Sequence, residues 1–293
     1  MLALTVLIRV LANPIANVFQ KQLTQRSAHP VFIIAIVHAA LALICLPFVL
    51  TSSAFDVGAA VWNNMVIAAL LAVSGNVLLV YALRQTDLSV LGPINAYKSV
   101  VGLTLGIVLV GERPTPAGLT GVLLIVAGSY FVMDTRPNQP LTHTFVRFFS
   151  GRGIQLRFAA LLFSAGEAVF LKRAIVLSSP WRVFALWSTL GFLVSGAVVP
   201  ILVRNQITRQ LRIVRASGSK YGGLVSATGL MQLATVLTFR ELQVGYSLAL
   251  FQLSAVISVL LGRRYFAESR VRERLFGSLV MAAGAALIVV FGH

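Results

Sequence analysis

The chain has 293 residues, of which 58% are hydrophobic and only 11% are charged, and its mean hydropathy is +0.89. A soluble domain is about half apolar and a quarter charged, so this composition excludes a soluble protein and indicates an integral membrane protein. The net charge of +16 comes mostly from Lys and Arg in short connections between apolar runs. This placement favours contact with membrane lipids and predicts no nucleic-acid partner.

The chain contains one cysteine, Cys45, which excludes an intramolecular disulfide and offers no metal cluster. We therefore expect no cofactor and no metal. The first apolar run contains Arg9 and Asn13 and lacks both a basic leader and a small-residue cleavage site. We expect this run to be retained as a helix rather than removed as a signal peptide.

About 20 residues of helix cross the hydrocarbon of a bilayer, and the sequence has ten apolar runs of about that length. The fold class that we predict is an all-α integral membrane protein with spans at residues 3–22, 31–50, 62–83, 88–110, 115–134, 156–176, 183–203, 221–239, 244–262 and 272–291. Two basic segments, Ile201–Lys220 and Thr142–Phe158, are expected to lie against lipid headgroups.

The second half of the chain repeats the first. The stretch Leu88–Met133 returns 156 positions later as Val244–Val289, with identities that include Arg84 and Arg240, Gly106 and Gly262, Glu112 and Glu268, Gly121 and Gly277, and Gly128 and Gly284. VFQK at Val18–Lys21 likewise matches VFLK at Val169–Lys172. We predict two five-helix repeats, 1–135 and 156–293, joined by a basic loop at 136–155. Because five crossings are an odd number, the second repeat is inverted, as in transporters that work by alternating access.

The distribution of Lys and Arg predicts how the chain is oriented in the membrane. Seventeen of them, Lys21, Arg157 and Arg274 among them, fall in or beside the connections after odd-numbered helices, against five on the opposite side. Since cytoplasmic loops carry the excess of basic residues, we predict a bacterial inner-membrane protein with both termini outside the cytoplasm. Small residues at Gly102, Gly106, Ser258 and Gly262 further predict close packing of the fourth and ninth helices, and packing of the two against each other is one arrangement that this pattern allows.

The stretch GPINAYKSVVGLTLGIVLVGERPTPAGLTGVLLIVAGSYFV and its diverged copy, which ends in YFAESRVRERLFGSLVMAAGAALIVV, resemble the EamA type of the drug/metabolite transporter superfamily. The resemblance covers nearly the whole chain and implies a ten-helix transporter. Relatives export or exchange amino acids, drugs, nucleotide sugars, phosphorylated metabolites or choline, so the resemblance does not select a substrate. Members commonly place both termini in the cytoplasm, and the charge distribution of this chain predicts the opposite.

Ionisable residues inside a membrane are costly, so each is a candidate for function. Arg9 shares one helix face with Asn13 and Asn17, a polar stripe that is expected to line an aqueous cavity. Lys98 is a candidate ligand for a substrate carboxylate or phosphate. Glu167 is either a proton-coupling carboxylate or the partner of a permanent ion pair with Arg9 or Lys98.

Asn76 and Gln232 fall opposite each other under the repeat and are predicted to face one another across the axis that relates the halves. Three further side chains complete the expected apolar pocket with a few hydrogen-bonding groups: Tyr97, Trp187 and Gln252. His38 is interpreted as a packing residue. Glu112 and Glu268 sit beside Arg at turns and are interpreted as helix-end ion pairs or caps.

No catalytic motif is present: the sequence has no phosphate-binding glycine loop, no HExxH and no GxSxG. We therefore predict that the protein is not an enzyme but a secondary transporter of a small polar, zwitterionic or anionic metabolite. Two alternatives remain open, a carrier of a lipid-linked phosphate and a membrane scaffold or sensor without transport.

Overall fold

A computed structural model describes residues 1–51, 55–98, 100–101, 115–132, 146, 148–242 and 244–291 of the chain. Across these residues the fold is entirely helical, with twelve α-helices and one short 3-10 turn, η2 (Arg204–Gln206). The helices are α1 (Leu2–Gln25), α2 (Pro30–Thr51), α3 (Ala59–Gln85), α4 (Leu88–Ile94), α6 (Pro116–Val132), α8 (Arg152–Leu177), α9 (Pro180–Leu202), α10 (Ile207–Ala216), α11 (Gly218–Glu241), α12 (Val244–Phe251), α13 (Ser254–Phe266) and α14 (Val271–Phe291).

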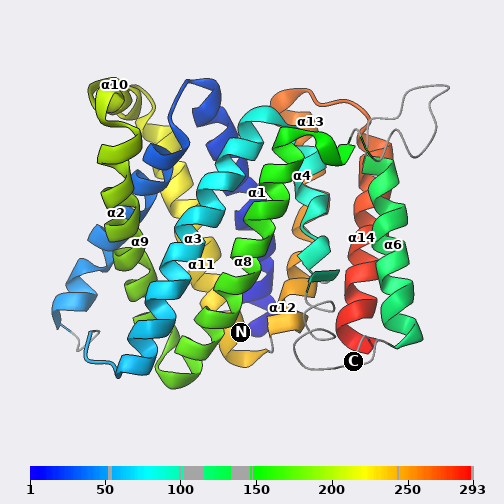
Figure 1. Cartoon of the computed structure of the whole chain (residues 1–293), viewed down its shortest axis with the longest axis horizontal. Helices are drawn as coiled ribbons and strands as arrows, with labels where there is room; N and C mark the ends of the chain where they lie inside the picture. Colours follow the sequence, from blue (N-terminus) through cyan, green and yellow to red (C-terminus); the bar gives the residue numbers. More distant parts are fainter. Residues whose placement is uncertain are drawn as a thin grey trace.

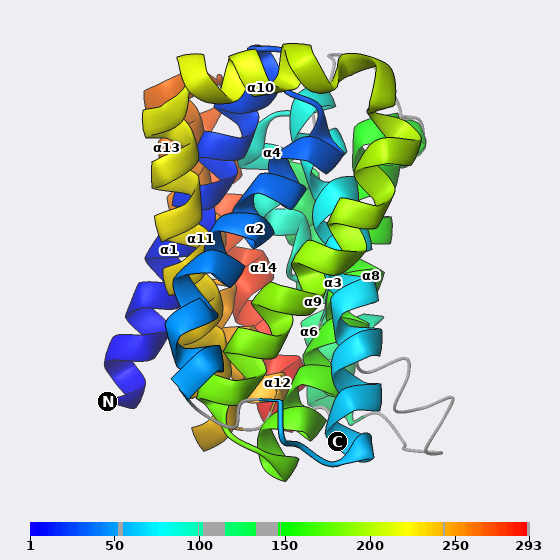
Figure 2. The ribbon, with the colours of Figure 1, turned by 90° about the vertical axis from the view of Figure 1, so that its left-hand side faces the viewer.

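The long helices run side by side between two faces of the molecule (Figure 1). One face, which we call the α10 face, holds α10 and the connections 26–29, 86–87 and 267–270, and α10 lies across it at right angles to the long helices (Figure 2). The start of α1 and the end of α14 lie on the opposite face, which we call the terminal face (Figure 1). Helix α1 therefore runs from the terminal face to the α10 face, whereas α8 runs the other way.

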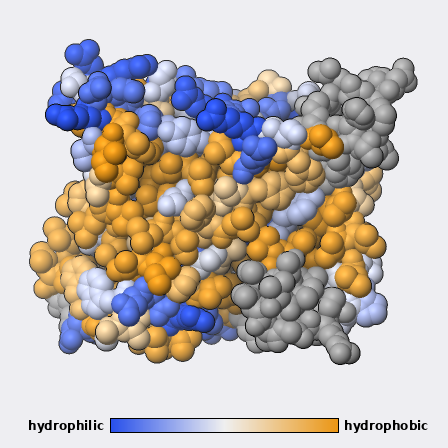
Figure 3. Space-filling model, in the orientation of Figure 1, coloured by the Kyte–Doolittle hydropathy of each residue, from blue (hydrophilic) through white to orange (hydrophobic). Residues whose placement is uncertain are grey.

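Apolar side chains form a broad band across the middle of the face seen in Figure 3. Large side chains such as Leu43, Val176 and Ile201 point outward there, and Ile201 is 76% exposed. Within the described residues, five helices are long and apolar enough to cross a bilayer: α1, α2, α3, α9 and α11. Since exposed apolar surface of this extent suits lipid rather than water, the protein is a multi-pass membrane protein.

The helix packing pairs elements of the two halves. Helix α1 packs against α11 and α3 against α8, while α2 packs against α9, α4 against α13 and α6 against α14. The expected close approach of the fourth and ninth helices is confirmed where it is described, because a Cβ on Gly92 of α4 would come within 2.6 Å of the Ser258 Cβ on α13. Gly102 and Gly106 lie outside the described residues.

Glycines bring α6 and α14 together. A Cβ on Gly121 would lie 2.6 Å from the Gly284 carbonyl oxygen, and a Cβ on Gly284 would lie 2.6 Å from that of Gly121. One Cβ on Gly277 would likewise meet the Gly128 carbonyl oxygen at 2.6 Å. Backbones approach this closely only where side chains are absent, which is how helices associate in lipid.

Two predicted spans, 88–110 and 244–262, are not continuous helices, and this part of the prediction is wrong. Helix α4 ends at Ile94 and is followed by a turn at 95–96, while α12 ends at Phe251 and α13 begins at Ser254. Pro93 contributes to the first break because it lacks the N–H needed to continue the ladder. Under the 156-residue repeat the first break falls on the second, within one residue.

Candidate functional site

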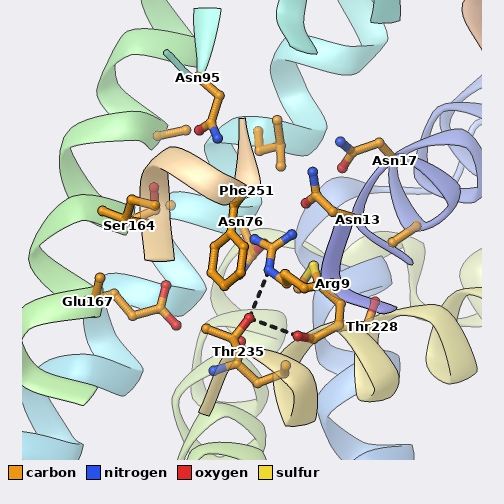
Figure 4. Close-up of a pocket in the computed structure, with 18 of the residues that line it drawn as sticks. Arg9, Asn13, Asn17, Asn76, Asn95, Ser164, Glu167, Thr228, Thr235 and Phe251 are labelled. Atoms are coloured by element: carbon orange, nitrogen blue, oxygen red, sulfur yellow. Dashed lines mark hydrogen bonds between the residues drawn. The ribbon is translucent and has the colours of Figure 1, made fainter. Parts of the chain in front are cut away.

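A cavity of about 930 Å³, counting the part open to solvent, lies in the middle of the bundle. Its walls come from α1, α3, α8, α9, α11 and α12 and from the segment that follows α4. Eight of the ten predicted site residues line it: Arg9, Asn13, Asn17, Asn76, Lys98, Glu167, Trp187 and Gln232. Figure 4 shows several of these side chains pointing into the same space from different helices.

The polar stripe of α1 faces the cavity, as the residue spacing predicts. Arg9, Asn13 and Asn17 all line it, and Gln20 continues the stripe one turn further along. The Asn13 Nδ2 donates a hydrogen bond to the Ser254 Oγ at the start of α13, 3.5 Å away. The stripe therefore joins the first helix to the break in the ninth span.

Arg9 is held from two sides. Its Nε donates to the Thr235 Oγ1 of α11 across 2.8 Å, and its guanidinium carbon lies 4.8 Å from the centre of the Phe251 ring (Figure 4). Such a cation–π contact is attractive when desolvated. The NH1 nitrogen of Arg9 is buried and has no hydrogen-bond partner, so one end of the guanidinium remains available to a ligand.

Glu167 of α8 points into the cavity from the wall opposite α1 (Figure 4). Its Oε1 accepts a hydrogen bond of 2.9 Å from the Trp187 Nε1 of α9. The His38 ring packs against Trp187 with the ring centroids 4.4 Å apart, and this contact agrees with the interpretation of His38 as a packing residue. Among the described residues, Glu167 makes no ion pair with Arg9 or Lys98 within 4.0 Å.

Arg157 is a site residue that the sequence interpretation missed. Counted there among the basic residues of a cytoplasmic connection, it is instead 8% exposed within α8 and lines the cavity. Its Nε donates to the Leu91 carbonyl oxygen and its NH2 to the Asn95 Oδ1, each across 3.0 Å. The sequence does not indicate that Arg157 lines the cavity, because the residue lies near the predicted start of a helix, where a basic side chain usually reaches the headgroups.

Amide and hydroxyl groups complete the lining. Asn76 lines the cavity, and its Nδ2 donates to the Ala72 carbonyl oxygen of its own helix, 2.9 Å away. Gln232 lines the same cavity from α11, and its Nε2 is buried without a partner, as is the Thr228 Oγ1. Buried polar atoms without partners are rare in folded proteins, so these two are suited to bind water or a ligand.

Two predicted site residues lie elsewhere. The Tyr97 ring packs edge-on against Phe158 and Phe149, with centroids 5.1 and 6.5 Å away, and it does not line the cavity. Gln252 is 1% exposed in the second helix break, where its Nε2 donates to the Leu248 carbonyl oxygen across 3.0 Å. Both positions follow from the helix breaks, which turn these side chains away from the cavity.

Lys21, Asp87, Glu268 and Arg274 form an ionic cluster at the α10 face. The Glu268 carboxylate accepts hydrogen bonds from the Lys21 Nζ at 2.8 Å and from the backbone N–H groups of Leu88 and Ser89 at 2.8 and 2.9 Å. Arg274 lies 3.9 Å from the same carboxylate and 3.1 Å from that of Asp87. The interpretation of Glu268 as a helix-end ion pair and cap is thus confirmed, since it binds the N-terminus of α4. Glu112 lies outside the described residues.

Some of the seventeen basic residues used to predict the orientation in the membrane lie inside the protein. Lys21 and Arg274 are assigned by sequence to cytoplasmic connections, but Arg274 is 1% exposed and both serve the ionic cluster. With Arg157, three of the seventeen residues are buried and bond other parts of the protein, and Arg26 and Lys220 also donate hydrogen bonds to the side chains of Ser217 and Gln22. Most of the remaining ones stay on the α10 face, where Arg209, Arg212 and Arg215 of α10 are exposed.

Among the described residues, no three His, Cys, Asp or Glu side chains lie close enough together to hold a metal ion. The groups that line the cavity are fixed charges and hydrogen-bonding side chains, which are suited to binding a polar ligand. A polar cavity within a helical bundle whose outer surface is apolar is typical of membrane transporters.

The model of the EamA-like transporter family matches residues 2–134, the first half of the chain. A comparison with curated proteins finds no match. One solved structure, described only as the crystal structure of a protein, is 16% identical, covers 95% of each of the two chains and has a TM-score of 0.58. That likeness concerns the fold alone. The match over residues 2–134 agrees with the resemblance drawn from the repeated sequence stretch.

Proposed function

We propose that the protein is a secondary transporter that moves a small anionic or zwitterionic metabolite across the bacterial inner membrane by alternating access. The observation on which this proposal depends is the cavity itself: three cationic side chains, Arg9, Lys98 and Arg157, and one carboxylate, Glu167, line it. Charged groups in the interior of a membrane bundle mark substrate or ion pathways. The surplus of positive charge favours a ligand that carries at least one negative group.

Two inverted five-helix repeats supply the alternating geometry. The first helices of the halves, α1 and α8, run in opposite directions, and the glycine contacts between α6 and α14 are reciprocal: Gly121 and Gly284 correspond to Gly277 and Gly128 under the repeat. Both halves also contain a broken span beside the cavity, a feature typical of inverted-repeat transporters.

A pair of hydrogen bonds supports the same symmetry. Lys21 at the end of α1 donates to the Thr86 carbonyl oxygen after α3, at 3.2 Å. Its counterpart Lys172 on α8 donates to the Leu242 carbonyl oxygen after α11, at 3.1 Å. Because these residues correspond pairwise under the repeat, each half uses the same lysine to fix the same corner, on opposite faces of the molecule.

We place the α10 face in the cytoplasm and both termini outside. The exposed arginines of α10 lie on that face, and basic residues are retained on the cytoplasmic side. A reporter that is active only outside the cytoplasm, fused after His293, is expected to be active. An inactive periplasmic reporter together with an active cytoplasmic one would reverse the orientation.

Binding of candidate ligands to the purified protein tests the proposed substrate class. Thermal unfolding is measured with acidic and neutral amino acids, phosphorylated metabolites, quaternary amines and a lipid-linked phosphate. We expect stabilisation by an anionic or zwitterionic member, followed by its uptake into liposomes. Stabilisation by the lipid-linked phosphate alone would favour the lipid-carrier alternative, and stabilisation by quaternary amines alone would overturn the proposed charge preference.

A further inference from the structure

Arg157 is bonded to a neighbouring segment of the chain through two of its nitrogens. Its guanidinium joins α8 to the end of α4 through two hydrogen bonds of 3.0 Å, to the Leu91 carbonyl oxygen and to the Asn95 side chain. A guanidinium presents its N–H donors in a fixed planar arrangement, and here two of its three nitrogens, Nε and NH2, already donate hydrogen bonds. The side chain is nine-tenths buried, so these bonds form away from bulk water.

The hydrogen bond to Leu91 replaces one that the helix has lost. In a continuous helix the Leu91 carbonyl would accept from the N–H of Asn95, four residues on. That N–H donates instead to the Gly92 carbonyl oxygen at 3.1 Å, because the chain tightens where α4 ends. A backbone carbonyl left without a donor within the membrane costs several kcal/mol, and the Arg157 Nε supplies the donor.

The other half of the protein places an arginine in a related position. Arg9 comes from the first helix of its half and lies over Phe251, the residue that corresponds to Asn95 under the repeat. Arg9 uses one nitrogen, Nε, to bind Thr235, and its NH1 is buried without a partner. Each helix break is therefore contacted by an arginine from the opposite half. Of the two arginines, only Arg9 has a buried nitrogen without a hydrogen-bond partner.

We propose that Arg157 is a positioning residue that fixes the break after α4, and with it Asn95 and Lys98, whereas Arg9 is the arginine that binds the anionic group of the substrate. The part that concerns Arg9 rests on the proposed transport function. The part that concerns Arg157 rests on the two hydrogen bonds alone. Lys98 follows the break by one turn of chain and lines the cavity, so the geometry of the break decides where its side chain lies.

Thiol labelling tests the proposal without knowledge of the substrate. The chain has one cysteine, so Cys45→Ala combined with Lys98→Cys leaves a single thiol beyond the break. Its rate of reaction is measured with an anionic and a cationic methanethiosulfonate reagent of similar size. Arg157→Lys, Arg157→Gln and Arg9→Gln are each added to this background. Arg152→Gln on the exposed side of the same helix is the matched control.

If Arg157 positions the break, Arg157→Lys and Arg157→Gln both change the labelling rate by at least about tenfold, and with both reagents, because each variant loses the forked bonds to Leu91 and Asn95. Arg9→Gln is expected to slow only the anionic reagent, since it removes an attracting charge. Arg152→Gln leaves both rates unchanged. Should Arg157→Gln fail to fold, Arg157→Lys is sufficient for the test.

The opposite pattern overturns the proposal. In that pattern, Arg157→Lys labels at the same rate as the Cys45→Ala, Lys98→Cys background, and Arg157→Gln slows only the anionic reagent. Arg157 would then act through its charge in the cavity and not as a positioning residue. Unchanged labelling in both variants would also reject it. Because labelling requires no transport, a protein that fails every uptake assay but shows the predicted labelling loses only the proposed function and the role of Arg9.

Discussion

Lys21 and Glu268 form a buried ion pair, with the Lys21 Nζ 2.8 Å from the carboxylate oxygen and the two side chains 11% and 3% exposed. The pair joins the end of α1 to the turn between α13 and α14, and the same carboxylate binds the N-terminus of α4. Three elements from the two halves are therefore tied together at one point on the α10 face. This relationship leads to the first prediction.

Glu268→Gln is expected to destabilise the protein in a pH-dependent way. Burial alone would raise the pKa of Glu268, but hydrogen bonds from Lys21 and Ser89 and the charge of Lys21 hold that pKa below its usual value. A depressed pKa in the folded state adds stability above the unfolded value of 4.5, and this stability is lost as the pH falls through the folded pKa.

Thermal unfolding between pH 3 and pH 8 measures the effect. Breaking a buried ion pair costs roughly 3–5 kcal/mol, so Glu268→Gln should unfold at a clearly lower temperature at neutral pH and approach the unsubstituted protein in acid. Glu273→Gln is the matched control, because Glu273 is exposed in the next helix. Equal unfolding temperatures for the two variants at neutral pH would contradict the prediction.

His29 is expected to destabilise the fold in mild acid. Burial and the nearby positive charge of Arg84 lower the pKa of His29 from its ordinary value of 6.5. The unfolded chain then takes up a proton before the folded one does, so stability falls as the pH drops below about 6.5. His29→Gln should remove that part of the decline, read as a smaller loss of unfolding temperature between pH 7 and pH 5. An unchanged decline would show that His29 does not contribute.

Adding a methyl group at the contact between α6 and α14 should destabilise the protein to a similar extent from either helix. Gly121→Ala and Gly284→Ala each place a Cβ against the other glycine's backbone, and overpacking of this kind costs about 1–3 kcal/mol. Gly222→Ala, which meets no atom within 4 Å in α11, should instead stabilise by about 0.5–1 kcal/mol. Thermal unfolding compares the three. A harmless Gly121→Ala would mean that the two helices are not this close.

Much of the architecture can be predicted from the sequence, because hydrophobic length and repetition are local signals. The predicted limits of α1, α2, α6, α9 and α14 all agree with the structure to within a few residues. The helix breaks are harder to predict: Pro93 marks one of them, but the corresponding residue of the second is Ala249. A broken and an unbroken apolar run look alike when no breaking residue separates them.

The partners of buried charges are also invisible in a single sequence. Arg157 and Arg274 were expected among headgroup-facing residues, and only the packing of α8 and α14 shows that they are internal. Arg9 and Glu167 were easier to predict, because an ionisable residue in mid-span has no route to water. The sequence predicts Tyr97 in the pocket because an aromatic group suits an apolar site, but its ring packs against Phe158 instead, a contact that no sequence pattern indicates.

Lys98→Ala is expected to weaken ligand binding without loss of stability. The Lys98 side chain lines the cavity and makes no hydrogen bond and no ion pair within 4.0 Å with another described residue, so truncating it breaks no contact of that kind. An anionic ligand that stabilises the protein should lose at least about tenfold in affinity, as when a hydrogen bond to a charged group is removed. Titration of the ligand against unfolding temperature measures both quantities. A large fall in the unfolding temperature without ligand would assign Lys98 a structural role instead.

Glu167→Gln is expected to abolish the pH dependence of transport. Glu167 is the one carboxylate among the described residues that line the cavity, and Gln keeps its shape and its ability to accept from the Trp187 Nε1 but cannot exchange a proton. Uptake into liposomes is measured with and without an imposed pH gradient. The unsubstituted protein should respond to the gradient, whereas Glu167→Gln should support only exchange that ignores it.

Trp187→Phe provides the matched variant for this test. It keeps an aromatic ring against His38 but removes the hydrogen bond of 2.9 Å that orients Glu167. If Glu167 couples protons, Trp187→Phe should shift the pH profile of uptake while keeping its dependence on pH, because the carboxylate is still present in a changed environment. A Glu167→Gln protein that still responds to the gradient would show that Glu167 is structural and that the proton, if one moves, is carried elsewhere.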